Sequence, residues 1–220
     1  MLESSLIVSC QAPVDSPLHD AKIIAAMAKA AVMQGATGVR IDTPEHVREV
    51  RSQLPDIPLI GLWKKQFSES DVYITPCYEQ AIAIAASGAD IIAIDATLRE
   101  RPNGETVPEL IEKIHTQLGK QVMADIDTIE SAIAAADAGA DFIGTTLYGY
   151  TPSTQHCSPP GYSLLTEIVE RLQVRAICEG GISSPEEAKK ALDLGAYAVV
   201  VGGAITGIDL KVKAFRAVFP

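Results

Sequence analysis

Four copies of one short phrase constrain the fold of this 220-residue chain more than any other feature. A helix-like stretch ends in Gly-Ala and passes directly into an apolar strand at residues 35–36, 88–89, 139–140 and 195–196, at spacings of 53, 51 and 56 residues. Glycine suits the left-handed position that ends a helix, so each copy predicts a helix that is followed at once by a strand. Repeats of this length also occur in solenoids, so the residues between the copies must decide the architecture.

One further strand lies between successive Gly-Ala copies, which makes eight predicted strands in all. They cover about residues 6–9, 38–41, 59–62, 91–94, 122–124, 142–145, 175–178 and 198–201. Amphipathic stretches follow them and predict helices at about 21–34, 44–53, 79–87, 107–118, 130–138, 164–172, 185–194 and 210–218. Strict alternation favours parallel strands, and eight units in this length predict an α/β single-domain (β/α)8 TIM barrel over residues 1–220. The alternative is an open doubly wound sheet, although no GxGxxG motif follows the first strand.

The composition fits this architecture and narrows the range of partners. Hydrophobic residues make up 47% of the chain and aromatic residues only 5%, so the apolar content is aliphatic, as in buried parallel strands. The formal net charge of -10 argues against nucleic-acid and membrane-surface partners, which are themselves anionic. Because the first residues lack a basic segment and a long apolar run, we expect no signal peptide and a cytoplasmic protein.

The four cysteines, Cys10, Cys77, Cys157 and Cys178, are scattered and form no CxxC pair. This spacing predicts reduced thiols rather than disulfides. His156 beside Cys157 resembles a fragment of a ligand set, but no nearby residues complete it, so we expect no metal site.

Polar residues stand where the predicted strands end, at the rim where barrels of this kind place their active sites. Arg40, Lys64, Asp95, Asp125 and Glu179 each follow an apolar run, which would place them around one mouth. A single charge at a strand end can simply mark the emergence of the chain into water, but charges at so many strand ends favour a site.

Two further positions near this rim need separate interpretation. Side chains alternate along a strand, so only one of Lys64 and Lys65 can face the mouth. Asp127 precedes Thr128 and Glu130, and we interpret it as a cap of the following helix.

Two glycine pairs, Gly180-Gly181 and Gly202-Gly203, follow the last two strands, where this fold usually binds phosphate. Without a Cβ atom, backbone N–H groups can approach an oxyanion closely, and a short helix N-terminus adds its dipole. Tight turns also use glycine, but this placement predicts a phosphate-binding site formed by the four residues.

These features, in this order, resemble the N-acetylmannosamine-6-phosphate 2-epimerases of bacterial sialic-acid catabolism. The matching phrases run along nearly the whole chain and include LIVSCQAP at 6–13, PLIGLWKK at 58–65, MADIDT at 123–128, FIGTTLYGYT at 142–151, ICEGGI at 177–182 and AVVVGGAIT at 198–206. The resemblance implies a cofactor-independent interconversion of N-acetylmannosamine 6-phosphate and N-acetylglucosamine 6-phosphate by a homodimer. It implies that the acid/base pair is Lys64 and Glu179 and that the substrate-binding residues are Gln11, Arg40, Asp125, Thr145 and Tyr150.

The chain departs from the family pattern at two positions. The family commonly has arginine where this chain has Gly181 and Gly207. The loss of two guanidinium groups near the phosphate end predicts weaker phosphate binding, and an arginine restored at residue 207 would strengthen it if that position faces the phosphate.

The implied chemistry demands neither a hydride carrier nor a metal. The C2 hydrogen lies next to a carbonyl only when the sugar ring is open, so the site must open the ring, abstract the proton and stabilise the enolate. A lysine serves as the base only if its pKa falls well below about 10.4, and burial beside Arg40 would lower the pKa of Lys64. Two alternatives stay open: a Schiff-base phosphosugar aldolase or lyase that uses Lys64 as its nucleophile, and a phosphometabolite-binding barrel without catalysis.

Overall fold

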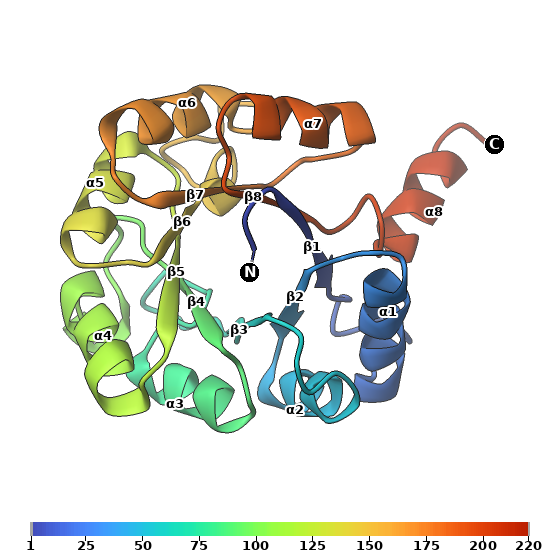
Figure 1. The fold of residues 1–220 in the computed structure, drawn as a ribbon, viewed down its shortest axis with the longest axis horizontal. Helices are drawn as coiled ribbons and strands as arrows, with labels where there is room; N and C mark the ends of the chain where they lie inside the picture. The colour runs from blue at the N-terminus through green and yellow to red at the C-terminus, as the bar shows by residue number, and fades with distance from the viewer. Residues whose placement is uncertain (1, 220) are drawn as a thin grey trace.

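The computed structural model describes residues 2–219, which form a closed barrel of eight parallel strands in chain order (Figure 1). The strands are β1 (Ser5–Cys10), β2 (Gly38–Asp42), β3 (Leu59–Leu62), β4 (Ile91–Asp95), β5 (Gln121–Asp125), β6 (Phe142–Gly144), β7 (Arg175–Glu179) and β8 (Ala198–Val201). The helices are α1 (Ala21–Met33), α2 (Pro44–Gln53), α3 (Tyr78–Ala86), α4 (Val107–Lys113), α5 (Ile129–Asp137), α6 (Tyr162–Arg171), α7 (Pro185–Asp193) and α8 (Ile208–Arg216), with short turns η1 (Pro102–Gly104), η2 (Ile114–Leu118) and η3 (Thr145–Leu147). Because β1 pairs with β8, the predicted barrel is confirmed and the open doubly wound sheet is wrong.

The four Gly-Ala copies end α1, α3, α5 and α7 in the same way. Their glycines have positive φ angles of 100, 102, 92 and 93° at Gly35, Gly88, Gly139 and Gly195. In each copy the alanine N–H donates to the carbonyl five residues earlier, as Ala36 does to Ala31 at 3.1 Å. This closure needs a left-handed residue just before the alanine, which glycine adopts without steric cost. The predicted helix ends are therefore confirmed, and each leads directly into an even-numbered strand.

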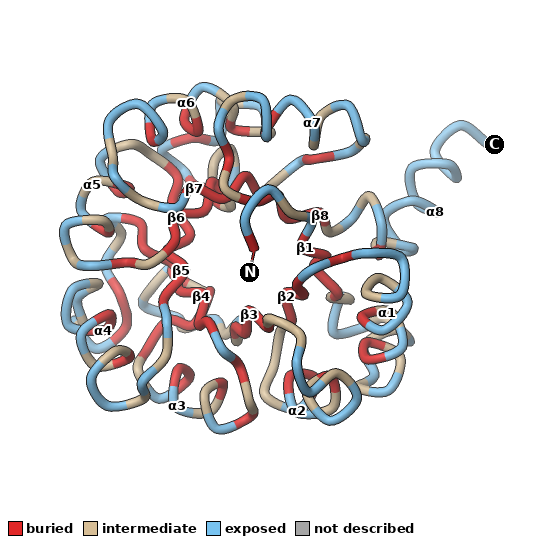
Figure 2. Tube along the Cα trace, viewed as in Figure 1, coloured by how far each residue is buried: buried red, intermediate tan, exposed pale blue. Residues whose placement is uncertain are grey.

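Buried residues form two layers, one between the barrel and its helices and one inside the barrel. Figure 2 shows buried residues along the strands and on the helices around them. Side chains alternate between these layers along each strand. The inner layer includes Ile7, Leu62, Met123, Ile177 and Val200. The residues two positions later therefore lie inside the barrel at the carboxyl ends of the strands. These residues are Ser9, Lys64, Asp125, Glu179 and Gly202. The pleat of the strands thus gathers four polar side chains and one glycine at the same end of the barrel.

The last helix departs from the predicted arrangement. It covers Ile208–Arg216 rather than 210–218, and Gly207 precedes it as its N-cap. Figure 1 shows α8 standing away from the ring formed by the other helices, and none of its side chains is buried. None of the helices in residues 2–219 combines the length and the apolar character that crossing a membrane requires.

The interpretation of Asp127 as a helix cap is wrong. The neighbouring Thr128 caps α5, because its side chain accepts a hydrogen bond from the Ser131 backbone N–H at 3.2 Å. Asp127 is buried and accepts hydrogen bonds from the Ser131 hydroxyl at 2.9 Å and the Thr151 hydroxyl at 2.7 Å. Through these two hydrogen bonds Asp127 connects Thr151, in the loop after β6, to Ser131, in the first turn of α5.

Candidate active site

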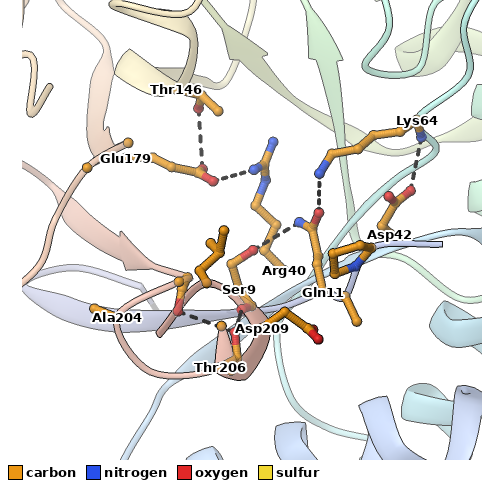
Figure 3. Close-up of a pocket in the computed structure, with 18 of the residues that line it drawn as sticks. Ser9, Gln11, Arg40, Asp42, Lys64, Thr146, Glu179, Ala204, Thr206 and Asp209 are labelled. Carbon is orange, nitrogen blue, oxygen red and sulfur yellow. Dashed lines mark hydrogen bonds and ion pairs between the residues drawn. The ribbon is translucent and has the colours of Figure 1, made fainter. Parts of the chain in front are cut away.

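A cavity of about 990 Å³ opens at the carboxyl ends of the strands. Its walls come from the ends of β1, β2 and β3 and from the loops that follow β6, β7 and β8 (Figure 3). The side chains that meet inside it include Gln11, Arg40, Lys64, Thr146 and Glu179. The cavity is therefore where the predicted polar rim of the barrel becomes one site.

Arg40 ties two carboxylates together at the floor of this cavity. The residue is 3% exposed, and its Nη2 donates to Asp125 Oδ2 at 2.5 Å. Its Nη1 donates to Glu179 Oε1. Three strands thus contribute one buried group each, and an isolated buried charge would cost far more than this paired arrangement.

Burial changes the protonation of both carboxylates, because a charged group loses hydration in the barrel interior. It raises the pKa of Asp125 to about 7, although the neighbouring Arg40 acts in the opposite direction. Burial also raises the pKa of Glu179 against the effect of Arg40. The Thr146 hydroxyl lies 2.6 Å from Asp125 Oδ1 and 3.3 Å from Glu179 Oε2, so its single proton can be donated to either carboxylate. Asp125 can consequently hold or release a proton near neutral pH, and Glu179 keeps its proton to a higher pH than an exposed glutamate does.

Lys64 follows β3 and extends into the cavity opposite Glu179 (Figure 3). Its Nζ donates to Gln11 Oε1 at 2.5 Å, and its backbone N–H donates to Asp42 Oδ1 at 2.9 Å. Burial lowers the pKa of Lys64, and the charge of Arg40 lowers it further, while Asp42 raises it. An amine with a lowered pKa can lose its proton more readily at neutral pH.

The neighbouring Lys65 points elsewhere. Its Nζ lies 4.7 Å from the centre of the Trp63 ring, where a cation meets the negative face of the aromatic system. Lys65 is not among the residues that line the cavity. The alternation of side chains along the strand therefore assigns the cavity to Lys64.

The glycine turns after β7 and β8 form the other end of the cavity. Gly180, Gly181, Gly202 and Gly203 all line it, and Gly180 and Gly181 have φ angles of 102 and 72°. Residues 202–207 form a helical turn in which the Gly202 carbonyl accepts from the Thr206 N–H at 3.0 Å. Such a turn directs its first N–H groups outward, which is the arrangement that binds anions at helix starts.

Neither Gly181 nor Gly207 has room for a side chain. A Cβ atom on Gly181 would lie 2.6 Å from Pro159 Cβ and 3.1 Å from the Pro159 carbonyl carbon. A Cβ atom on Gly207 would lie 2.7 Å from the Gly203 carbonyl oxygen. An arginine at residue 207 would have to displace this backbone, a constraint that the sequence did not reveal.

Comparison with known proteins is consistent with these features. A model of the family described as "Putative N-acetylmannosamine-6-phosphate epimerase" matches residues 24–218. The chain belongs to this family. Relatives from Synechococcus elongatus and Thermosynechococcus vestitus, both named "Putative N-acetylmannosamine-6-phosphate 2-epimerase", are 61% identical over 215 residues and 59% identical over 216 residues. These matches cover 97% and 98% of this chain and 93% of each relative.

A solved structure of the N-acetylmannosamine-6-phosphate 2-epimerase from Clostridium perfringens has the same architecture. It matches with a TM-score of 0.94 and 42% sequence identity, over 99% of this chain and 94% of that chain. The barrel of this chain therefore has the architecture of the epimerase family, and the predicted residues are compared below with the cavity at the carboxyl ends of its strands.

Most of the predicted residues lie in this epimerase-family cavity, but three lie behind its surface, among them Asp95, which is buried and paired with Arg99. Gln11, Arg40, Lys64, Glu179 and Tyr150 line the cavity, and Tyr150 is 56% exposed at its mouth. Asp125 is fully buried and does not line the cavity, so it reaches a ligand only through Arg40 and Thr146.

Thr145 also lies behind the wall. Its hydroxyl donates to the Glu179 carbonyl at 2.9 Å and accepts from the Glu179 N–H at 3.1 Å. The adjacent Thr146 lines the cavity instead, as does Tyr73, and neither residue was predicted to bind the substrate. Phe142 belongs to the inner layer and Thr146 lies four positions later, so the alternation of side chains along the strand favours Thr146 over Thr145 for the cavity.

Proposed function

We propose that this chain interconverts N-acetylmannosamine 6-phosphate and N-acetylglucosamine 6-phosphate by moving protons at C2. The observation that carries the proposal is the placement of two proton-transfer groups, Lys64 and Glu179, in one cavity with Arg40 between them (Figure 3). The choice of substrate is supported by the family to which the chain belongs and by the names of its relatives. Inversion at C2 of the mannosamine derivative produces the glucosamine derivative, and the reverse reaction uses the same groups.

The pKa directions suit a reaction that both removes and returns a proton. The C2 hydrogen becomes acidic when the ring opens and C1 is an aldehyde. Lys64, whose pKa is lowered by burial, can take a proton, and Glu179, whose pKa is raised by burial, can supply one. Proton transfer to opposite faces of a planar enolate inverts the configuration. Ring opening moves the proton of the C1 hydroxyl to the ring oxygen, and ring closure returns it. Glu179 can relay this proton by accepting it at one oxygen and donating at the other, so that its own protonation is unchanged after each of these steps.

Arg40 stabilises the intermediate in this proposal. The enolate develops negative charge on the C1 oxygen, and a fixed guanidinium beside it stabilises that charge without rearrangement. Arg40 is held by Asp125 and Glu179, so its position does not depend on substrate. Asp125 is then a positioning residue, and Gln11 orients the amine of Lys64.

The glycine turns would bind the phosphate at the far end of the same substrate. Gly180, Gly181, Gly202 and Gly203 offer backbone N–H groups, which bind oxyanions best where no Cβ intervenes. Tyr150 stands at the mouth, where its ring could cover the sugar. Binding of the phosphate fixes the reacting carbon relative to Lys64, which is how remote contacts accelerate the reaction.

A Schiff-base aldolase or lyase is the second candidate, because the lowered pKa of Lys64 would also make it a nucleophile. Borohydride added with the substrate would trap a covalent adduct on Lys64 in that reaction and none in the epimerase. A barrel that binds the phosphosugar without catalysis would give no turnover at all.

Solvent exchange tests the proposed reaction. Product formed from N-acetylmannosamine 6-phosphate in deuterated water should carry deuterium at C2, followed by proton NMR. Product that keeps all of its original C2 hydrogen would exclude proton abstraction at this carbon.

We further propose that the chain forms a homodimer through α8. Two of its apolar side chains that do not line the cavity are highly exposed, at 61% for Val212 and 72% for Phe215. Exposed apolar surface of this extent marks an interaction surface, and homo-oligomers most often bury the same surface of two copies. The outward position of α8 leaves this surface free for a second copy (Figure 1).

Light scattering tests this interface. Phe215→Asp should convert the dimer to monomer, whereas Ile82→Asp, at another exposed position on α3, should stay dimeric. A wild-type monomer, or a dimer that persists in the Phe215 variant, would contradict the interface. A cytoplasmic location and a place in sialic-acid catabolism stay predictions from the sequence.

A further inference from the structure

The cationic side chains that line the cavity differ in whether they have a polar partner in the protein. Arg40, Lys64 and Lys211 are the lysine and arginine side chains among its described lining residues. Arg40 is paired with two carboxylates, and Lys64 is held by Gln11 at the sugar end. Lys211 forms no salt bridge with any residue in the described range 2–219. It is therefore the lining cation whose charge is still available for a ligand.

At the glycine end of the cavity a positive charge would offset the repulsion between a nearby carboxylate and a bound phosphate. Asp209 lines the cavity there, and its Oδ2 accepts a hydrogen bond from Ser16 Oγ at 2.9 Å. A carboxylate repels a phosphate dianion, and the chain as a whole carries a net charge of -10. The loops themselves cannot supply a cation at Gly181 or Gly207, since a side chain at either position would clash.

The geometry of α8 directs Lys211 to this end. Gly207, Leu210, Lys211 and Ala214 all line the cavity, and their spacing of three, four and seven residues defines one face of the helix. The Lys211 N–H donates to the Gly207 carbonyl at 3.0 Å, so the residue stands one turn above the glycine turn. Lys213 lies on another face of α8 and does not line the cavity.

We propose that Lys211 is the side-chain cation that recognises the substrate's phosphate, acting beside the backbone N–H groups of the glycine turns. The proposal rests on the proposed function, because it assigns the phosphate end of the same cavity. Lys211 offsets the charge of Asp209 and favours the phosphorylated sugar over the unphosphorylated one. A lysine on a flexible stem contributes charge without needing space inside the tight loops.

Three variants test this assignment: Lys211→Ala, Lys211→Arg and the matched control Lys213→Ala. Loss of one exposed charge-assisted contact should raise KM for N-acetylmannosamine 6-phosphate about tenfold. It should leave kcat within about twofold, because Lys211 does not touch the reacting carbon. Lys211→Arg should retain most of the affinity, and Lys213→Ala should match the wild type in both constants.

Binding of inorganic phosphate, followed by phosphorus NMR titration, separates this proposal from the proposed function. Phosphate should bind the wild type and Lys213→Ala equally and bind Lys211→Ala about tenfold more weakly. That result supports Lys211 even if the wild type turns over no amino sugar, in which case only the proposed function fails. Equal phosphate affinity in all variants, or no phosphate binding to the wild type, would overturn the assignment.

Discussion

The side-chain amine of Lys64 donates a hydrogen bond to the side-chain carbonyl of Gln11, with Nζ 2.5 Å from Oε1. The amide is oriented by a second bond, from Gln11 Nε2 to Ser9 Oγ at 2.9 Å. Gln11 thus positions the amine through a neutral acceptor. A carboxylate in the same place would favour the charged ammonium, so the choice of an amide keeps the lowered pKa of Lys64.

Gln11→Glu should therefore make Lys64 a poorer base. The added negative charge raises the pKa of Lys64, so activity at pH 7 should fall about tenfold and recover at higher pH. The measurement is kcat as a function of pH. Gln11→Ala removes the hydrogen bond without adding charge, and an equal upward shift of its pH profile would show that electrostatics is not the cause.

Lys64→Ala and Lys65→Ala should differ sharply in turnover. Loss of a general base typically costs about 10²–10⁴-fold in rate, so the Lys64 variant should be nearly inactive. The Lys65 variant should keep most of its activity, because that side chain lies over Trp63 outside the cavity. Steady-state kinetics at substrate saturation distinguishes the two. The reverse pattern would refute the assignment of Lys64.

Asp125 should make stability depend on pH. Its pKa in the folded protein is about 7, above its ordinary value of 3.8, so the folded state holds the proton more tightly than the unfolded chain. The resulting stabilisation is largest below pH 4 and is lost as the pH rises to about 7. As the pH rises from about 4 to about 7, the free energy of unfolding of the wild type should therefore fall by a few kcal/mol more than that of Asp125→Asn.

Denaturant unfolding at several pH values between about 4 and 8 measures this slope. Asp56→Asn, at an exposed loop position, is the matched control and should keep the wild-type slope. An Asp125→Asn slope equal to that of the wild type would mean that the buried carboxyl does not titrate in this range.

Gly207→Ala should destabilise the protein. Its new Cβ atom would lie 2.7 Å from the Gly203 carbonyl oxygen, which belongs to the backbone and cannot move alone, so the cost should be about 1–3 kcal/mol. Gly203→Ala is the control, because its Cβ atom would meet only the flexible end of Leu210 at 3.2 Å. Thermal unfolding compares the two variants. Equal melting temperatures would show that residue 207 has room for a side chain.

Local features of the chain determined much of the fold and part of the site. The Gly-Ala copies end helices through a hydrogen bond that spans six residues, so a short stretch of sequence contains the whole interaction. The alternation of side chains, likewise local, allowed only one of Lys64 and Lys65 to face the mouth, and the family resemblance then selected Lys64. These predictions depend on backbone geometry within one element, which the residues of that element specify.

Only the tertiary structure decided how those side chains share the space at the rim. The Thr146 hydroxyl lies within reach of both Asp125 and Glu179, and Asp125 lies behind Arg40 because β2, β5 and β7 each contribute one of the paired groups. The exclusion of side chains at Gly207 and the outward position of α8 also arise from contacts, or their absence, between distant segments of the described chain. The sequence by itself determined which strand ends carry polar residues. Their pairing, burial and protonation were decided by packing between strands, because electrostatic and steric interactions depend on distances that no single segment sets.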